Sequence, residues 1–500
     1  VDEAVARLDD MLNDKKGPAL VSKEQIRARL LPGGAPGELA VKMSKGQPDF
    51  IISRRLFAKP IAGVMYGLPG VGLTQEPRRH YPYGAMASAT LGWVGDVRVH
   101  PSGVFGLELS EEKLLRGVDG REVKEIDARR RTIPERSTRT EPQDGLDLML
   151  TIDLNIQQAA EEELAKAVQS SHALQGQCIV MDPKTGEILA IATYPTWDAN
   201  APGKSPVPLL NPAISNFYEP GSTFKIVPVI GALEEKLVRD GQQVTYCSGT
   251  MPIGRRAIHE AHHAHGAVDC GRLLEQSCNL GAATLALKLG PTKFLHWCEA
   301  LGYGAKTGIE LENESPGSLN RRNIEAKITL ANMGFGQSLA VTPLQMVAAY
   351  SAVANGGEWI QPHLIKSRQN TDRTTWTAFT APRRRVCAPE TAALLRKYLE
   401  RVVAQGTGTA AAVSGYRVGG KTGTAQKPPY YARKYIGSFI GVMPMDNPRL
   451  AIIAVIDEPK TSIYGGVVAG PVVAGVGQRA LQYLSIPPTL PVKAAKKTTP

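Results

Sequence analysis

A serine followed three residues later by a lysine, at the start of an apolar helix, is the most reactive pattern in this sequence. In "EPGSTFK", Pro220 and Gly221 break the chain, which places Ser222 in the first helical turn and Lys225 on the same face. A serine hydroxyl is a weak nucleophile until a base takes its proton, and a partly desolvated lysine can be that base. Backbone N–H groups at the helix start can stabilise a developing oxyanion. The pattern predicts acyl transfer through Ser222.

The tripeptide Lys-Thr-Gly occurs three times, beginning at Lys184, Lys306 and Lys421. The first copy joins two apolar runs and is typical of a hairpin turn, and the second lies in a predicted loop. The third, in "GGKTGTAQ", lies on a predicted strand of small residues, where a substrate backbone can approach as an added strand. We therefore expect the third copy at the site, with Lys421, Thr422, Gly423 and Thr424.

A third polar element, Ser277-Cys278-Asn279, offers a hydroxyl and an amide that could relay a proton and hold a substrate amide. Ser-x-x-Lys alone is weak evidence, because Ser110 to Lys113 repeats it within a charged stretch. The order Ser-x-x-Lys, Ser-x-Asn, Lys-Thr-Gly, with separations of about 50 and about 140 residues, is far more specific.

The elements that must position these residues divide the chain. After a short amphipathic opening, the first 140 or so residues combine brief apolar stretches, Gly/Pro-rich pieces and dense charge, and the run 129–131 of arginines indicates a solvated face. This predicts an elongated module of short strands and loops. A strand at 148–152 and a helix capped by Asp153 then begin a second domain. About five strands flank a helical segment from about 221 to 405. Most of them are joined by short links, which predicts an antiparallel sheet.

Bulk composition limits the possible partners. The 500 residues exceed what one core usually serves. A net charge of +11 favours contact with an anionic surface, and the alternative is a basic protein with no such partner. No basic stripe interleaved with aromatic residues appears, so nucleic acid is not expected. No apolar run is long enough to span a bilayer. The chain starts at Val1 without Met, so we expect its true N-terminus to be missing.

The histidine-rich stretch 259–265 lies between Cys247 and Cys270. Imidazoles and thiolates at this density could bind zinc, but their spacing matches no tight ligand pair. A Cys247–Cys270 disulfide or a plain loop is the preferred interpretation, and we predict no metal and no cofactor.

The three motifs resemble those of the penicillin-interacting serine transpeptidase and β-lactamase superfamily. "VMDPKTGEILAIATYPTWDAN", "YEPGSTFK" and "VGGKTGTAQ" are similar to class B penicillin-binding proteins, and "GFGQSLAVTPLQMVAAYSAVANGG" and "ALGYGAKTGIELENESPG" resemble the division-type, septal group. The resemblance implies an α+β fold: a penicillin-binding/serine β-lactamase-like transpeptidase domain with an antiparallel five-stranded sheet, helices on both faces and a helical subdomain. The expected domains are a pedestal of the dimerisation type at 1–144, the transpeptidase domain at 145–485 and a disordered basic tail at 486–500.

The family also implies a role for each motif residue. Ser222 would be acylated by the D-Ala-D-Ala end of a peptidoglycan stem peptide, with Lys225 as base. Ser277 and Asn279 would complete the proton relay and hold the donor. Lys421 would orient Ser277 and attract the terminal carboxylate, which Thr422 and Thr424 would bind on the strand that contains Gly423. The backbone N–H groups of Ser222 and Thr424 would form the oxyanion hole.

The resemblance further implies β-lactams as inhibitors, and a polymerising glycosyltransferase and other division proteins as partners. It implies a single-pass anchor in the cytoplasmic membrane with the catalytic domain outside. The anchor and an Arg-Gly…Asp-Arg-Asn-Gly segment are absent here, so we expect a fragment of the exported part. Pro228 should kink the nucleophile helix. The alternatives are a D,D-carboxypeptidase or β-lactamase-type hydrolase, an elongation-type transpeptidase, and an inactive scaffold, although every motif residue is present.

Overall fold

The computed structural model describes residues 39–41, 50–53, 72–75, 79–95, 102–128, 133–205, 209–261 and 263–491. The chain forms two compact units, Val1–Pro82 and Tyr83–Pro500. The first unit contains one antiparallel sheet in the order β1-β2-β3, with bounds Leu39–Val41, Phe50–Ser53 and Gly72–Gln75. The amphipathic opening lies outside the described residues.

Residues 83–144 carry short elements, as predicted. They are α3 (Ser88–Leu91), β4 (Trp93–Val94), β5 (Gly103–Phe105), α4 (Gly106–Ser110), α5 (Glu112–Leu115), β6 (Arg121–Val123), η1 (Pro134–Arg136) and β7 (Thr138–Thr140). Strands β4 and β5 pair with each other, as do β6 and β7. The predicted solvated run of arginines at 129–131 lies outside the described residues.

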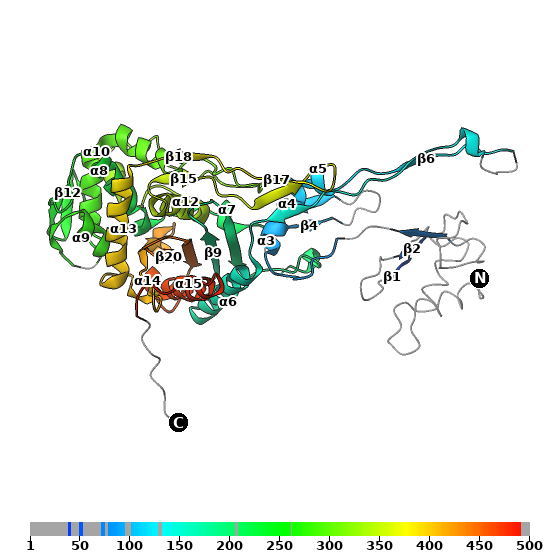
Figure 1. Cartoon of the computed structure of the whole chain (residues 1–500). Helices are drawn as coiled ribbons and strands as arrows, with labels where there is room; N and C mark the ends of the chain where they lie inside the picture. The colour runs from blue at the N-terminus through cyan, green and yellow to red at the C-terminus, as the bar shows by residue number, and fades with distance from the viewer. Residues whose placement is uncertain are drawn as a thin grey trace, which may run out of the picture. The chain divides into compact units, whose positions relative to one another are not determined.

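The predicted five-stranded antiparallel sheet is present in the second unit (Figure 1). Its order is β10-β9-β21-β20-β19, with bounds Ile188–Tyr194, Gln175–Met181, Leu450–Asp457, Tyr435–Met443 and Gly419–Gln426. The strand that contains the third Lys-Thr-Gly, β19, lies at one edge. Pairing joins Ile191 to Ile179, Ile179 to Ile453, Ile453 to Ile440, and Ile440 to Lys421. Because paired residues share a face of the sheet, Lys421 continues a row of isoleucines.

Helices cover both faces of this sheet, as the alternation of its side chains requires. On one face, β9 and β21 residues such as Val180 and Ile452 pack with α6 (Leu154–Ser170), α14 (Gly465–Val468) and α15 (Gly470–Tyr483). On the other, Ile179 and Ile453 pack with α8 (Ile226–Glu234) and α12 (Pro343–Ala354). As predicted, the Asp153 carboxylate caps α6 by accepting from Asn155 and Ile156 N–H.

The helical subdomain lies between β10 and β19 in the sequence. It contains α7 (Pro212–Ser215), α9 (Cys270–Glu275), α10 (Asn279–Ala300), α11 (Lys327–Gly334) and α13 (Pro389–Ala404). Two hairpin-like pairs accompany them: β11 (Thr245–Cys247) with β14 (Gly266–Val268), and β12 (Thr250–Ile253) with β13 (Arg256–His259). The remaining strands are β8 (Leu148–Leu150), β16 (Ile365–Gln369) and β17 (Trp376–Ala378) in one sheet, and β15 (Glu358–Ile360) with β18 (Arg383–Arg385).

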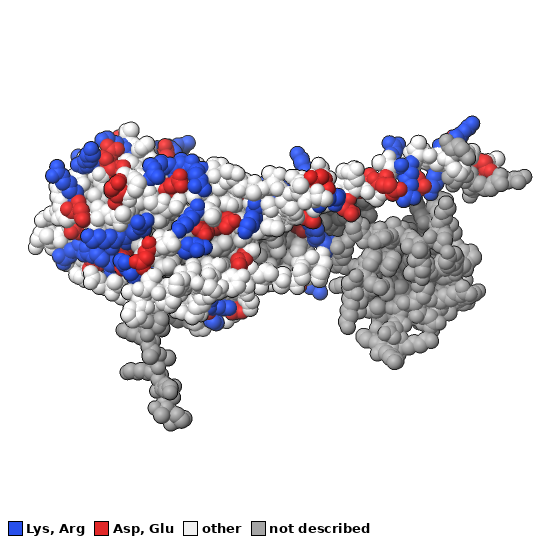
Figure 2. Space-filling model, viewed as in Figure 1, with Lys and Arg blue, Asp and Glu red and all other residues white. Residues whose placement is uncertain are grey.

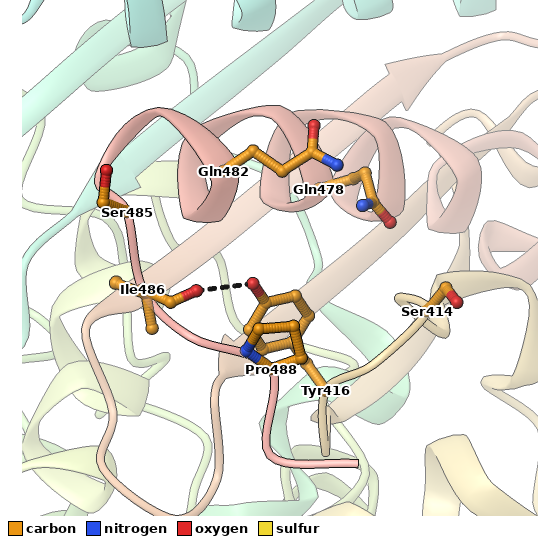
Figure 3. Close-up of a pocket in the computed structure, with 7 residues that line it drawn as sticks. All are labelled: Ser414, Tyr416, Gln478, Gln482, Ser485, Ile486 and Pro488. Carbon is orange, nitrogen blue, oxygen red and sulfur yellow. Dashed lines mark hydrogen bonds between the residues drawn. The ribbon is translucent and has the colours of Figure 1, made fainter. Parts of the chain in front are cut away.

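The C-terminal segment departs from its prediction. Residues 486–500 were expected to be disordered, but the carbonyl of Ile486 accepts from the Tyr416 hydroxyl at 2.6 Å (Figure 3). The N–H groups of Thr489 and Leu490 donate to the Gly415 carbonyl at 2.9 and 3.0 Å. These contacts border a pocket of about 420 Å³ beside α15. A disordered tail therefore does not begin at 486, and residues 492–500 lie outside the described residues.

The surface carries both signs of charge. On the face shown in Figure 2, the described Lys and Arg side chains lie among Asp and Glu side chains over the second unit, so this face offers no single-sign stripe. Among the described residues, no helix combines the length and the apolar character needed to cross a membrane.

Candidate active site

Ser222 lies where the sequence predicted, in the first turn of a helical segment. That turn is the 3-10 helix η3 (Gly221–Lys225), and α8 follows directly. Gly221 has φ +56°, and a Cβ there would lie 2.8 Å from the Thr424 carbonyl oxygen, so a glycine lets η3 approach β19. The sequence predicted Pro228 in the interior of one kinked helix. Pro228 is instead the third residue of α8, in its first turn, where proline is tolerated.

Lys225 is fully buried, and its ammonium group reaches the Ser277-Cys278-Asn279 turn. Its Nζ donates to Asn279 Oδ1 at 2.7 Å, to Ser277 Oγ at 3.3 Å and to the Ser277 carbonyl. Burial lowers the pKa of Lys225 to about 8, against the opposing charge of Glu260. A substantial fraction of this amine is therefore neutral near physiological pH and available as a base.

Lys421 reaches the same serine from the sheet. Its Nζ lies 3.0 Å from Ser277 Oγ and 3.2 Å from Thr422 Oγ1, and the side chain is fully buried. Because it continues a row of isoleucines, burial holds the pKa of Lys421 well below its usual range, and the charge of Lys225 adds to this effect. The Ser277 hydroxyl thus lies between two desolvated lysines.

The turn that carries Ser277 has a special backbone. Ser277 has φ +61°, a left-handed conformation that costs energy for a residue other than glycine and is enriched at functional sites. The next residue, Cys278, caps α10, since its sulfur accepts from the Gly281 N–H. The short break between α9 and α10 therefore directs the Ser277 hydroxyl and the Asn279 amide toward Lys225. The polar residue types in the sequence did not by themselves predict this orientation.

No hydrogen bond joins the nucleophile Ser222 to its expected base Lys225 among the contacts of the described residues. Among the described residues, we find no hydrogen bond made by the Ser222 hydroxyl, which is half-buried. Catalytic hydrogen bonds often tighten only when substrate is bound. The structure thus assembles Lys225, Ser277, Asn279 and Lys421 into one network, with Ser222 beside it on η3.

Strand β19 has the open, small-residue character that the sequence predicted. As an edge strand, it leaves backbone groups free to pair with an added chain. A Cβ on Gly423 would lie 2.3 Å from Ser438 Oγ and 3.0 Å from the Pro220 carbonyl, so the glycine permits close packing with η3. Thr422 and Thr424 are half-buried on the alternate face. The Thr424 hydroxyl accepts from the Gly465 N–H at 3.3 Å.

The other copies of the motifs are apart from this network. Lys184-Thr185-Gly186 forms the turn between β9 and β10, and Lys306-Thr307-Gly308 lies in a loop, as predicted. The Ser110 hydroxyl ends α4 and donates to the Gly106 carbonyl at 3.2 Å.

Sequence reasoning missed a buried polar cluster behind the Ser277 turn. Glu260 accepts from the N–H groups of Asn279 at 3.0 Å and Leu280 at 2.8 Å. Burial opposes the ionisation of Glu260, but these bonds, the Cys278 thiol and Lys225 together lower its pKa. His265 lies in the same cluster, and burial lowers its pKa. The glutamate within "HEAHH" was the available signal.

The sequence favoured a Cys247–Cys270 disulfide or a plain loop, and the disulfide is not formed. All six cysteines are free and buried. Cys247 Sγ instead lies 3.5 Å from both Glu260 Oε1 and His265 Nδ1, at the end of β11. Linear spacing suggested the pairing, whereas the fold of the two hairpin-like strand pairs turns Cys247 toward the Ser277 turn.

Comparison with known proteins agrees with this architecture. The family described as penicillin binding protein transpeptidase domain matches residues 176–477, and the penicillin-binding protein dimerisation domain matches residues 2–150. Stage V sporulation protein D of Bacillus subtilis is 37% identical over 84% of this chain, which spans 66% of that relative. The probable peptidoglycan D,D-transpeptidase PenA of Neisseria gonorrhoeae is 33% identical over 91% of this chain and 77% of its own length.

Solved structures show the same fold. Penicillin-binding protein 3 of Mycobacterium tuberculosis, complexed with aztreonam, aligns with a TM-score of 0.72 and 30% identity over 85% of this chain and 94% of its own. The sheet, the nucleophile helix and the two-lysine network define a serine acyltransferase of the penicillin-interacting class. The chain belongs to the penicillin-binding protein transpeptidase family, with a dimerisation region before the transpeptidase domain. It is a class B, septal-type D,D-transpeptidase by resemblance, and the hydrolase alternatives are not favoured.

Proposed function

We propose that the chain cross-links peptidoglycan by moving a stem-peptide acyl group first to Ser222 and then to an amine of a second stem peptide. The observation that carries this proposal is the convergence of two fully buried lysines, Lys225 and Lys421, on the Ser277 hydroxyl beside η3. A serine nucleophile, a desolvated amine and a relay hydroxyl are the groups that acyl transfer from an amide requires.

In the acylation step, Ser222 Oγ attacks the carbonyl of the D-Ala-D-Ala amide while the neutral Lys225 amine takes its proton. The Ser222 and Thr424 N–H groups stabilise the oxyanion of the tetrahedral intermediate. The C–N bond then breaks, an ester forms on Ser222, and the departing D-Ala nitrogen receives a proton through Ser277. In the second step, an acceptor amine attacks the ester, which forms the 4→3 cross-link and returns the proton to Ser222.

Substrate binding follows from the edge position of β19. The donor peptide lies along this edge as an added strand and pairs with the backbone of β19. Asn279 holds a donor amide, and Lys421 with Thr422 and Thr424 receives the terminal carboxylate. β-Lactams, which the names of the solved relatives include, occupy the same place and acylate Ser222.

The cellular setting is septal wall synthesis, outside the cytoplasmic membrane. The names of the relatives support this setting, since one is a sporulation protein and others are D,D-transpeptidases. We propose that residues 1–144 form a pedestal, that residues 145–485 carry the reaction, and that an anchor precedes the chain. A polymerising glycosyltransferase and other division proteins are the proposed partners.

Labelling with a fluorescent penicillin tests this function. Mass spectrometry should find the added mass on the peptide that contains Ser222, and Ser222→Ala should abolish labelling, whereas Ser110→Ala should not. Mass on the Ser110 peptide would contradict the assignment. A second assay on lipid-linked polymer should yield cross-linked stem peptides; penicillin labelling with hydrolysis in place of cross-linking would instead favour a carboxypeptidase.

A further inference from the structure

Four side chains of metal-binding type meet behind the Ser277 turn, and the proposed reaction uses none of them. Cys247 ends β11, Glu260 follows β13, His265 precedes β14, and Cys278 caps α10. One ligand atom from each lies within 4.8 Å of all the others. Both cysteines are fully buried, and His265 is 7% exposed. These groups come from four separate segments, yet they converge on one point.

We propose that Cys247, Glu260, His265 and Cys278 bind one zinc ion that holds the Ser277-Cys278-Asn279 turn in place. Two thiolates, one imidazole and one carboxylate are four ligands of the kinds that zinc takes in tetrahedral sites. Thiolates disfavour magnesium and calcium, which select oxygen ligands.

The distances fit a tetrahedral ion. Typical zinc bond lengths place a sulfur and a nitrogen, or a sulfur and an oxygen, about 3.5 Å apart around the ion. Cys247 Sγ lies 3.5 Å from His265 Nδ1 and 3.5 Å from Glu260 Oε1. Cys278 Sγ lies 3.0 Å from Glu260 Oε1, and His265 Nδ1 lies 3.9 Å from Glu260 Oε2. All four ligand atoms lie within 4.8 Å of one another, so binding would draw the more distant ones closer to the ion.

The protons of the cluster also indicate where a cation would lie. The thiols of Cys247 and Cys278 both donate to one oxygen, Glu260 Oε1. A zinc ion would replace these two protons. Before binding, two neutral thiols and one carboxylate carry a charge of −1; after binding, two thiolates, the carboxylate and Zn²⁺ also sum to −1. Because the net charge of the cluster stays the same, the ion would order the pocket with little change in the electrostatic field at Lys225.

The orientation of His265 points the same way. Its Nδ1 faces the Cys247 sulfur and the Glu260 carboxylate. Its Nε2 is buried and has no hydrogen-bond partner among the described residues. Zinc bonded at Nδ1 would place the ring proton on Nε2, so the ion would use the nitrogen that faces the cluster and would leave Nε2 as it is.

The site would act on catalysis through position. Cys278 lies between Ser277 and Asn279, and Glu260 already holds the N–H groups of Asn279 and Leu280. An ion would tie that turn to both hairpin-like strand pairs of the subdomain and so stabilise the left-handed Ser277 backbone. Cys247 and His265 are then positioning residues, since neither contacts the Lys225 amine or the Ser222 hydroxyl.

Metal binding is measured on the whole chain, first stripped with a chelator under reducing conditions. Added Zn²⁺ should bind at one ion per chain, release about two protons per ion, and raise the melting temperature by on the order of 5 °C at a hundredfold excess over Kd. Co²⁺ in place of Zn²⁺ should give sulfur-to-cobalt charge-transfer absorption. Absence of stoichiometric zinc binding by the wild-type chain would overturn the proposal without reliance on any variant.

Two variants and a matched control locate the site. Cys247→Ser and His265→Gln should each weaken zinc affinity by about 100-fold or more, whereas Cys298→Ser, which replaces an equally buried thiol in α10, should retain it. Binding that survives both cluster variants, or a Cys247–Cys278 disulfide recovered with no metal bound, would also overturn the proposal.

The positioning role has its own readout. Reloading the stripped wild-type chain with Zn²⁺ should speed penicillin acylation by roughly 10-fold to 100-fold, with the same pH profile, because the ion restores geometry and leaves the local charge unchanged. Zinc binding without any change in acylation would refute the positioning role. Labelling of Ser222 itself tests the proposed function separately, so the two ideas can fail independently.

Discussion

The rate of penicillin acylation should rise steeply with pH up to about 8, because Lys225 must be neutral to accept the Ser222 proton. Burial lowers the pKa of Lys225 to about 8, and the charges of Glu260, Cys278 and Cys247 act in the opposite direction. Lys421, which contacts the same hydroxyl, has a pKa lowered by burial and by Lys225. Protonation of the amine therefore removes the base, and the reactive form is the one that accumulates as pH rises.

The size of the effect follows from these values. With a pKa of about 8, roughly 10% of Lys225 is neutral at pH 7 and about 1% at pH 6. An ordinary lysine with a pKa of about 10.4 would be about 0.04% neutral at pH 7. Burial thus increases the reactive fraction at pH 7 by about 200-fold. Acylation should increase about tenfold from pH 6 to 7, and should level off above about 8.

Stopped-flow mixing with a fluorescent penicillin between pH 5.5 and 9.5 measures this profile as a second-order rate constant. Circular dichroism at each pH provides the control for folding. Because Lys225 and Lys421 share Ser277, the apparent pKa belongs to the pair. A rate that stays flat from pH 6 to 8, or that rises only near pH 10, would refute the assignment of a desolvated lysine base.

Two further predictions concern the strand beside this base. Lys421→Ala should slow acylation by on the order of 100-fold, while Lys184→Ala and Lys306→Ala should leave it unchanged; equal losses at all three would contradict the choice of the third Lys-Thr-Gly. Gly423→Ala should lower both the melting temperature and the acylation rate, because its Cβ would lie 2.3 Å from Ser438 Oγ. Gly203→Ala, where nothing lies within 4 Å, is the matched control, and a silent Gly423→Ala would show that β19 tolerates a side chain.

Much of the site was predictable because its signals are local. A helix start after Pro-Gly, a strand of small residues and a hairpin turn each depend on neighbouring residues, and Ser222, Gly423 and Lys184 lie where those signals indicated. The five antiparallel strands also followed from short links and apolar runs. The depth of Lys421 did not, since its burial depends on strand register, which aligns it with Ile440, Ile453 and two further isoleucines.

The rest depends on contacts between distant segments. The cluster of Cys247, Glu260, His265 and Cys278 combines four segments whose meeting linear spacing could not predict. The sequence therefore favoured a disulfide or a plain loop. The order of residues 486–490 depends on Tyr416 and Gly415, which lie some 70 residues earlier. The close approach of η3 to β19 likewise depends on tertiary packing, because a Cβ at Gly221 would lie 2.8 Å from the Thr424 carbonyl oxygen.

The last prediction concerns where the independently stable catalytic unit begins. The sequence predicts a boundary at 144/145, whereas the compact unit begins at Tyr83. Elements before residue 145 pack on the sheet-bearing body: Trp93 contacts Trp197 edge-on at 5.3 Å between ring centroids, and Glu111 pairs with Arg368 at 2.6 Å. The Ala87 N–H also donates to Glu161 at 2.8 Å.

A fragment of residues 145–491 should therefore melt well below a fragment of residues 83–491. Removing the earlier elements exposes Trp197, which is 4% exposed, and uncovering such a side chain costs about 1.5–3 kcal/mol, with about 0.5–1.5 kcal/mol more for each lost aromatic pair. Thermal unfolding of both fragments, with penicillin labelling as the test of an intact site, measures the difference. Equal melting temperatures would place the boundary at 144/145 after all, and would mean that residues 83–144 serve as spacer alone.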